Sequence, residues 1–239
     1  MGDGLKIDAV GALLTVEMNR GPGNHFTQGM CEELSSVLVD PPSGSRILLL
    51  RSSGETFCTG RDGSARGASN VSAMVRALAE VNVAIISSEL TVVSEVGGPA
   101  AGFGVGLAGL SDVTIASSFA SFGFPEVRAS LSPALVLAWL PHVVGRRDAF
   151  WLASTGASFD ASEARSLGLV NEVVAPELLS SRVRAVIEEL LEISPSVLKA
   201  IKRDLRSSIV MQVREDSFAA ADRLALRALM GADQERAHA

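Results

Sequence analysis

The sequence is poor in cysteine, histidine and tyrosine. Its 239 residues include two cysteines, Cys31 and Cys58, three histidines and no tyrosine. Two cysteines cannot build a disulfide framework, and no CxxC pair or His/Cys cluster indicates a metal, so no metal site is predicted. No uncharged apolar run reaches the roughly 18 residues that cross a bilayer, and no basic-then-apolar leader opens the chain. We therefore expect a cytoplasmic protein without a membrane partner.

Basic residues are also in deficit. The chain carries 21 Lys and Arg against 27 Asp and Glu, for a formal charge of −6. This balance, with a pI near 5.2, argues against a nucleic-acid partner. Apolar residues make up 47% and charged residues 20%, the balance of an ordinary globular protein, which excludes a disordered chain.

The hydrophobic pattern predicts an α/β protein that ends in helices. Strands are expected at residues 5–7, 12–18, 47–50, 91–96 and 113–116, with 83–86 as a further candidate. Helices are expected at 27–39 with Thr27 as N-cap, 70–79, 135–144, 147–152, 161–167, 176–193, 196–208 and 216–230. Alternation of strands and helices favours a largely parallel sheet, and the uninterrupted helices after it form a helical C-terminal region.

Several motifs follow one another along the chain. Residues 56–62 read TFCTGRD, directly after the buried strand. Residues 97–104 read GGPAAGFG and lead to DVTIA at 112–116. FGFPE follows at 122–126, with Leu131 and Pro133 behind it. LPHVVG at 140–145 and a TG…A-x-E-A…LGLVNEV block over 155–174 complete the series. Each motif alone is weak, but the series is specific in its order and spacing.

In this order and spacing the motifs resemble the crotonase (enoyl-CoA hydratase/isomerase) family over roughly residues 13–207. The resemblance implies a crotonase-like ββα spiral core over residues 1–190. Residues 191–239 would form a helical region that serves trimerisation and ends in a shortened tail. It also implies a homotrimer or homohexamer that binds an acyl-CoA or an acyl-carrier thioester. Coenzyme A would then enter as part of the substrate, and no separate cofactor is expected.

The first two motifs suit thioester chemistry. Reaction beside a thioester carbonyl builds negative charge on its oxygen, and two backbone N–H groups aimed at that oxygen stabilise it. By resemblance, Arg61 and Phe103 supply these N–H groups. Both donors belong to the main chain, so bulky side chains at these positions are compatible with the role. The neighbouring residues predicted to contact substrate are Cys58, Gly60, Asp62, Gly102, Gly104 and Gly106.

The acids indicate the type of reaction. Family hydratases usually carry two glutamates that face one water, and Glu126 fills the second of these positions. The first falls at Gly106, which cannot transfer a proton. Apolar neighbours of Glu126 should raise its pKa, as a general acid/base needs. We therefore expect Glu126 to act alone, which favours double-bond isomerisation. Hydration or decarboxylation of an acyl thioester stays open, as does a catalytically silent thioester-binding or assembly subunit.

Other candidates compete with this interpretation. Residues 104–109 satisfy G-x-G-x-x-G, but the glycines fall inside an expected helix rather than before it, which disfavours a dinucleotide site. His25 and Glu95 are alternative pocket residues, although surface roles are expected for both. We expect Asp62 to fix its own loop through backbone hydrogen bonds.

Overall fold

The computed structural model describes residues 4–64 and 67–237. Its main sheet has six strands in the order β1-β2-β3-β4-β6-β9. The strands are β1 Leu5–Val10, β2 Leu13–Met18, β3 Ile47–Ser52, β4 Thr91–Val96, β6 Val113–Ser117 and β9 Glu172–Val174. Only the β1–β2 pair is antiparallel, and the other neighbours are parallel. The predicted α/β class with a largely parallel sheet is confirmed.

A second sheet of three short strands stands beside the first. It orders β5 Ala100–Ala101, β7 Ser121–Gly123 and β8 Ser158–Asp160. Sequence patterns did not predict this sheet, because strands of two or three residues are too short to display alternation. It matters for the site, because β5 leads directly into α3, Phe103–Gly109, and β7 leads into the short 3₁₀ helix η1, Pro125–Ala129.

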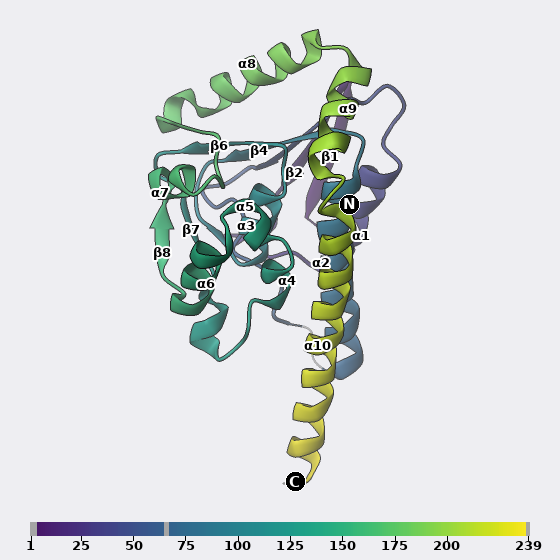
Figure 1. The fold of residues 1–239 in the computed structure, drawn as a ribbon, viewed down its shortest axis with the longest axis vertical. Helices are drawn as coiled ribbons and strands as arrows, with labels where there is room; N and C mark the ends of the chain where they lie inside the picture. The colour runs from purple at the N-terminus through teal and green to yellow at the C-terminus, as the bar shows by residue number, and fades with distance from the viewer. Residues whose placement is uncertain (1–3, 65–66, 238–239) are drawn as a thin grey trace.

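Helices cover both faces of the main sheet (Figure 1). On one face lie α1 Gln28–Val39, α2 Ala68–Ser87 and α3. On the other lies α8 Leu179–Glu192, which follows η2 Pro176–Leu178. Strand β3 is buried on both sides because Leu48 and Leu50 join the main core, whereas Ile47 and Leu49 pack under α8. The continuous apolar run at 47–50 predicted this double burial.

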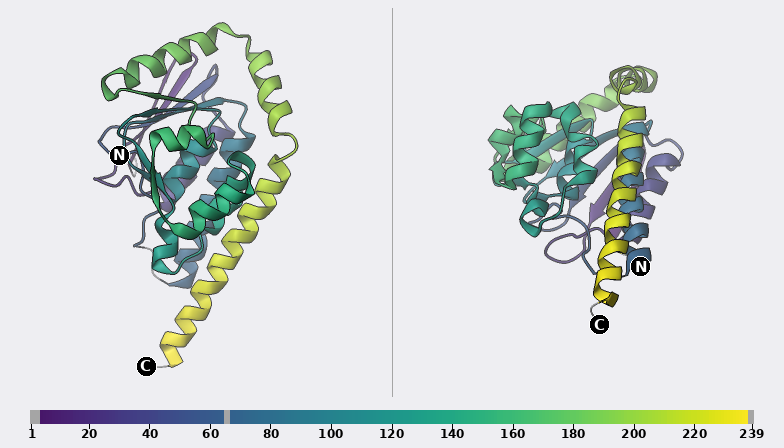
Figure 2. Two further views of the ribbon diagram at one scale, coloured as in Figure 1. Left: turned by 60° about the vertical axis from the view of Figure 1, so that its left-hand side comes forward. Right: turned by 60° about the horizontal axis from the view of Figure 1, so that its bottom comes forward.

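The C-terminal helices run along one side of the structure (Figure 1). The helices α9 Pro195–Arg206 and α10 Val210–Ala237 follow α8. Helix α10 lies along α2 in all three views and then extends past the body of the protein (Figures 1 and 2). The remaining helices are α4 Ala134–Leu137, α5 Leu140–Val143, α6 Arg146–Thr155 and α7 Ala161–Ser166.

Three expectations about the helices need correction. Residues 83–86 are the last turn of α2 and not a strand, because an apolar run buried on all sides reads the same in either structure. Residues 135–144 form two short helices rather than one. Pro141 has no N–H to donate to the Leu137 carbonyl, so α4 ends at Leu137 and α5 begins anew at Leu140. The last helix begins at Val210 rather than at residue 216.

Helix α2 is long and apolar enough to be a candidate membrane span by length and composition. Within the protein, 56% of that window is buried, and its buried residues belong to the core. Its apolar character therefore matches its place between the sheet and α10.

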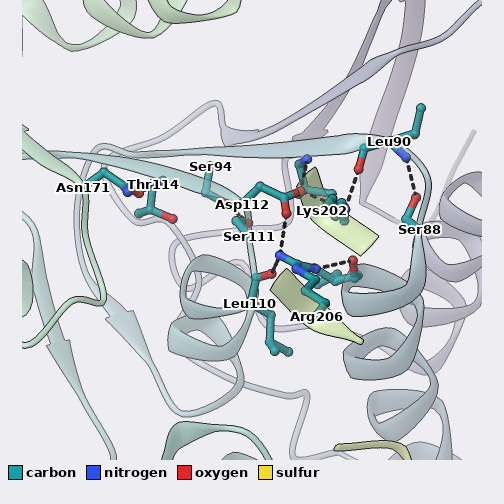
Figure 3. A network of polar contacts seen from close by, with 12 residues as sticks. Ser88, Leu90, Ser94, Leu110, Ser111, Asp112, Thr114, Asn171, Lys202 and Arg206 are labelled. Atoms are coloured by element: carbon teal, nitrogen blue, oxygen red, sulfur yellow. Dashed lines mark hydrogen bonds and ion pairs between the residues drawn. The ribbon is translucent and has the colours of Figure 1, made fainter. Parts of the chain in front are cut away.

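A buried ionic cluster fastens α9 to the sheet (Figure 3). The Asp112 carboxylate accepts the Val92 N–H at 2.8 Å and contacts the Lys202 ammonium at 2.8 Å and the Arg206 guanidinium at 2.7 Å. Lys202 also donates to the Leu90 carbonyl, and Arg206 donates to the carbonyls of Ile85 and Leu110. Burial lowers the pKa of Lys202 to about 8, although Asp112 opposes that shift.

Loss of the anion should therefore destabilise the fold. Asp112→Asn would leave two buried cations without a carboxylate, which should cost about 3–5 kcal/mol of unfolding free energy. Urea unfolding of wild type and variant at neutral pH measures this difference. Asp204→Asn removes an exposed carboxylate from the surface pair Arg203–Asp204 and should change stability by less than about 1 kcal/mol. Equal effects from the two substitutions would contradict the assignment.

Candidate active site

The site is built where two main-chain segments, residues 57–61 and 99–104, lie side by side. Cys58 and Ala100 form a parallel bridge, and the Ala101 N–H donates to the Cys58 carbonyl at 2.9 Å. A Cβ placed on Gly104 would lie 1.9 Å from that carbonyl oxygen. Only glycine at position 104 therefore allows the two segments to approach this closely.

The first of these segments leaves the Arg61 N–H free. Phe26 bridges Arg61 in parallel register, with the Phe26 N–H on the Gly60 carbonyl at 3.0 Å and the Asp62 N–H on the Phe26 carbonyl at 2.7 Å. In such a bridge the residue between the two bonds turns its own N–H away from the partner strand. Within the described residues, no acceptor pairs with the Arg61 N–H.

The second segment leaves the Phe103 N–H free at the start of α3. Gly102 is the N-cap with φ 53° and ψ −117°, a backbone conformation that favours glycine. The first N–H groups of a helix have no partner inside that helix, and no described acceptor outside α3 pairs with Phe103. Its ring packs edge-on against Phe26, with centroids 5.2 Å apart. Phe26 thus contacts both predicted donor residues.

Both donors line one cavity of about 650 Å³. Six of the predicted site residues contribute to its wall: Gly60, Arg61, Gly102, Phe103, Gly106 and Glu126. Apolar side chains of α2, Val71, Val75 and Leu78, form another part of the wall, together with Leu224 of α10. The cavity is thus mainly apolar, with a few polar groups, as small-molecule sites usually are.

Glu126 reaches this cavity from η1. The Leu131 N–H donates to the Glu126 carbonyl at 3.0 Å, and Ser130 adopts a left-handed conformation with φ 57° that turns the chain back. The carboxylate atom Oε2 is buried, and no described group hydrogen-bonds to it. Burial raises the pKa of Glu126, whereas its own backbone N–H and the Arg61 guanidinium act in the lowering direction. The expected direction of this shift is confirmed.

Gly102 also makes room for the acid. A Cβ at position 102 would lie 2.4 Å from Glu126 Oε1. The carboxylate therefore sits directly against the residue that precedes the Phe103 N–H. Acid and donor are neighbours because no side chain stands between them.

Trp139 stands opposite Gly106. A Cβ on Gly106 would contact the indole Nε1 at 3.5 Å, an ordinary van der Waals distance. A Cβ on Gly109 would lie 2.7 Å from the indole ring, so this glycine admits the ring itself. At position 106, where the resemblance would place a second acid, the backbone therefore faces the indole edge of Trp139.

The other three predicted substrate contacts lie outside the lining of this cavity. Cys58 is fully buried, and burial raises the pKa of its thiol to about 12, which favours a packing role. Gly104 lies against the backbone of Cys58. Asp62 accepts the Ser64 N–H at 2.7 Å and pairs with Arg20 at 2.6 Å, so its expected role in fixing the loop is confirmed.

The structure also shows where the alternative pocket residues and the glycine motif of residues 104–109 lie. His25 Nε2 lies 3.1 Å from Oγ1 of Thr59, a residue of the cavity wall. Glu95 accepts a hydrogen bond from Ser180 at 2.7 Å and lies outside this cavity. Residues 104–109 fall within α3, so these glycines lie inside a helix, where a dinucleotide fingerprint would open one.

Sequence reasoning missed five polar residues of the wall: Thr59, Asn82, Ser132, Trp139 and Arg227. A signal existed for Asn82, because it is the one amide inside the apolar end of α2. Trp139 fell inside the single helix expected over 135–144. Arg227 lies on α10, far along the chain, and no local pattern places it at the cavity.

Comparison with known families decides the relationship. The model of the family described as enoyl-CoA hydratase/isomerase matches residues 8–234. The chain belongs to the enoyl-CoA hydratase/isomerase family. The crotonase resemblance of its motifs and the crotonase-like fold are thereby confirmed.

An individual relative agrees with this assignment, and solved structures of similar proteins share the fold. A probable enoyl-CoA hydratase from Rhodobacter capsulatus is 30% identical over 190 residues, which cover 78% of this chain and 74% of that protein. An enoyl-CoA hydratase structure from Mycobacterium avium subsp. paratuberculosis superposes with a TM-score of 0.84 at 23% identity, covering 92% of this chain and 87% of the other. A Thermobifida fusca protein in complex with CoA superposes with a TM-score of 0.79 at 25% identity, covering 100% and 96%.

The buried acid should leave a signature in stability. Because its pKa is raised, the folded state binds the Glu126 proton more tightly than the unfolded chain does. The folded state therefore loses stability as pH rises from the ordinary carboxyl range through the raised pKa. Glu126→Gln removes this penalty. The variant should match wild type in acid and exceed it in unfolding free energy at neutral pH.

Urea unfolding of both proteins over a pH series measures the effect. Glu188→Gln, on the exposed side of α8, is the matched control. A gain at neutral pH that both variants share, or that persists unchanged in acid, would contradict a buried ionised carboxylate at position 126.

Proposed function

We propose that the protein moves a double bond within an enoyl-CoA thioester, with Glu126 as its only acid/base. The observation that carries this proposal is the composition of the cavity wall. Two backbone N–H groups without a described acceptor, those of Arg61 and Phe103, line it together with one carboxylate, that of Glu126. No second acid of the described chain lines that wall.

The chemistry needs these three groups alone. Glu126 takes a proton from C2 of a 3-enoyl thioester, and the freed electron pair moves onto the carbonyl oxygen. The N–H groups of Arg61 and Phe103 stabilise that oxyanion; loss of one such donor typically costs about 3–4 kcal/mol of transition-state stabilisation. The carboxylic acid then returns the proton at C4, which leaves the double bond between C2 and C3. One carboxylate serves both carbons.

Hydration needs more positioned groups than isomerisation does. A water must be held and deprotonated while a proton reaches the α-carbon, which usually takes two positioned groups. Gly106 offers neither a base nor a donor at the second position, and the indole of Trp139 across from it cannot accept a proton. This favours isomerisation over hydration. Hydration with Glu126 alone and decarboxylation, which needs only one proton donor, are the alternatives for this wall.

The relatives support a CoA thioester as the form of the substrate. A CoA-bound structure among the similar proteins supports coenzyme A as the thioester carrier. A carrier-protein thioester would place the same carbonyl against the same two donors. The apolar wall of α2 and α10 suits the acyl chain.

Assembly into a homotrimer or homohexamer is part of the proposal. Helix α9 exposes Val197, Ile201 and Leu205 at a spacing of four residues, with 47%, 50% and 74% of each exposed. Such a spacing puts the three side chains on one face of the helix. An exposed apolar stripe of this kind supports contact between copies of the chain.

Removal of the base should stop the chemistry without removing the site. Glu126→Gln should lower kcat by a factor on the order of 100 to 10,000, because the amide cannot transfer the proton, and should change thioester affinity little. Mass spectrometry of acyl-CoAs in deuterated water measures both turnover and exchange. A near-normal rate would remove Glu126 from the mechanism and direct attention to His25, the titratable group beside Thr59.

The balance between isomerisation and hydration should depend on Gly106. Wild type should convert 3-enoyl-CoA to 2-enoyl-CoA faster than it hydrates crotonyl-CoA. Gly106→Glu should raise hydration, because the backbone has room for a Cβ there and the new carboxylate can hold and deprotonate water. Gly106→Gln is the matched control, of equal size but unable to act as a base.

Product analysis by chromatography separates the two reactions. Efficient hydration of crotonyl-CoA by wild type, with no movement of a 3,4 double bond, would refute the isomerase proposal. Deuterium exchange without turnover would show a working base and a different natural acyl group.

A further inference from the structure

The cavity wall contains a hydrogen-bond donor that the proposed chemistry does not use. Trp139 is 1% exposed, yet it lines the cavity with its Nε1 edge turned toward Gly106. No acceptor in the described residues pairs with this N–H. Buried tryptophans normally find a partner for their N–H, and here the Nε1 edge opens onto the cavity, where a ligand can supply the acceptor. The empty position at Gly106 is what gives a ligand access to it.

A buried acceptor lines the same cavity. Asn82 is 2% exposed, and its Nδ2 donates to the Leu135 carbonyl at 3.3 Å and to Ser217 Oγ at 3.4 Å. A carbonyl can only accept, so this contact assigns the nitrogen and leaves Oδ1 on the other side of the amide. No described donor reaches Oδ1. The wall therefore holds one donor and one acceptor, on two side chains that are almost wholly buried, amid apolar neighbours.

We propose that the acyl group of the substrate carries a hydroxyl beyond the reacting carbons, and that Trp139 and Asn82 recognise it. The hydroxyl accepts from Trp139 Nε1–H and donates to Asn82 Oδ1. Among simple oxygen functions only a hydroxyl can do both, since a carbonyl or ether oxygen cannot donate. This assignment rests on the proposed function, because it takes the thioester to be held at Arg61 and Phe103.

The two side chains are specificity residues in this proposal. They bind a part of the acyl group that does not react, whereas Glu126 moves the proton. A site that hydrogen-bonds a substrate hydroxyl discriminates strongly against the analogue that lacks it, because its own buried groups are then left without partners. The apolar wall formed by Val71, Val75 and Leu78 contacts the rest of the chain.

The test compares 3-enoyl-CoA thioesters of equal length, without a hydroxyl and with one placed in turn at successive carbons beyond the double bond. At one placement, wild type should show a kcat/KM on the order of 10 to 100 times that for the plain chain. Isothermal titration calorimetry of the saturated hydroxyacyl and acyl-CoAs should show the same preference in Kd. No preference at any placement, in turnover or in binding, would overturn the proposal.

Two variants remove the donor in different ways. Trp139→Phe deletes the N–H, and Gly106→Ala covers it with a methyl group at 3.5 Å while the indole stays in place. Each should reduce the preference to within about threefold of unity. Alanine suits a helix interior, so Gly106→Ala keeps the test valid if Trp139→Phe fails to fold. Unchanged preference in Gly106→Ala would overturn the role of Trp139.

Matched controls lie away from the cavity. Trp151→Phe changes the other tryptophan, which is 63% exposed, and Gly54→Ala adds a methyl group in open space. Both should keep the wild-type preference. If no thioester is turned over or exchanged, the proposed function fails, and the Kd comparison still decides the hydroxyl. If plain and hydroxylated chains are isomerised alike, the hydroxyl proposal alone fails.

Discussion

The site depends on a contact between two stretches of backbone with no side chain between them. A Cβ on Gly98 would lie 1.7 Å from the Glu55 carbonyl oxygen, and one on Gly104 would lie 1.9 Å from that of Cys58. The obstructing atoms belong to the main chain, so no change of rotamer could relieve either clash. The positions of the Arg61 and Phe103 N–H groups follow from this contact. Their side chains can accordingly be as different as a guanidinium and a phenyl ring.

This arrangement fixes the electrostatics of the cavity before any ligand arrives. The two N–H groups are held by bridges and by the start of a helix, so they need little reorganisation to meet a developing negative charge. The carboxylate of Glu126 lies against Gly102 in a place where burial disfavours its charge. A buried carboxylate of this kind lowers the stability of the fold. The core of the sheet and the Asp112 cluster under α9 supply stability away from the reacting groups.

Sequence patterns predicted the parts of the protein that are local in the chain. The buried strand at 47–50 and the helix capped by Thr27 follow from runs and spacings of a few residues, and the structure has both. The motif order also led to Glu126, Arg61 and Phe103, which do share a cavity wall. The strand expected at 83–86 was wrong because an apolar run does not distinguish a strand from a helix buried on every side.

What sequence patterns missed depends on contacts between distant segments. Trp139 reaches the cavity because Pro141 breaks the helix around it and Gly109 admits its ring. Phe26 contacts both donor residues through its backbone and its ring, yet it lies in a loop between turn and helix with no motif of its own. Asn82 bonds to Leu135 of α4 and to Ser217 of α10, both more than fifty residues away along the chain. None of these relations has a period or a spacing that a linear pattern could display.

The pairing of α2 with α10 has a consequence for biosynthesis. One wall of the cavity comes from Val71, Val75 and Leu78, and another part from Leu224, which the ribosome adds much later. During translation the apolar side of α2 therefore emerges well before α10, which covers it in the folded protein. Chains emerge N-terminus first at about 5–20 residues per second. The nascent protein thus passes through several seconds in which this apolar wall of the cavity lacks the cover that α10 provides.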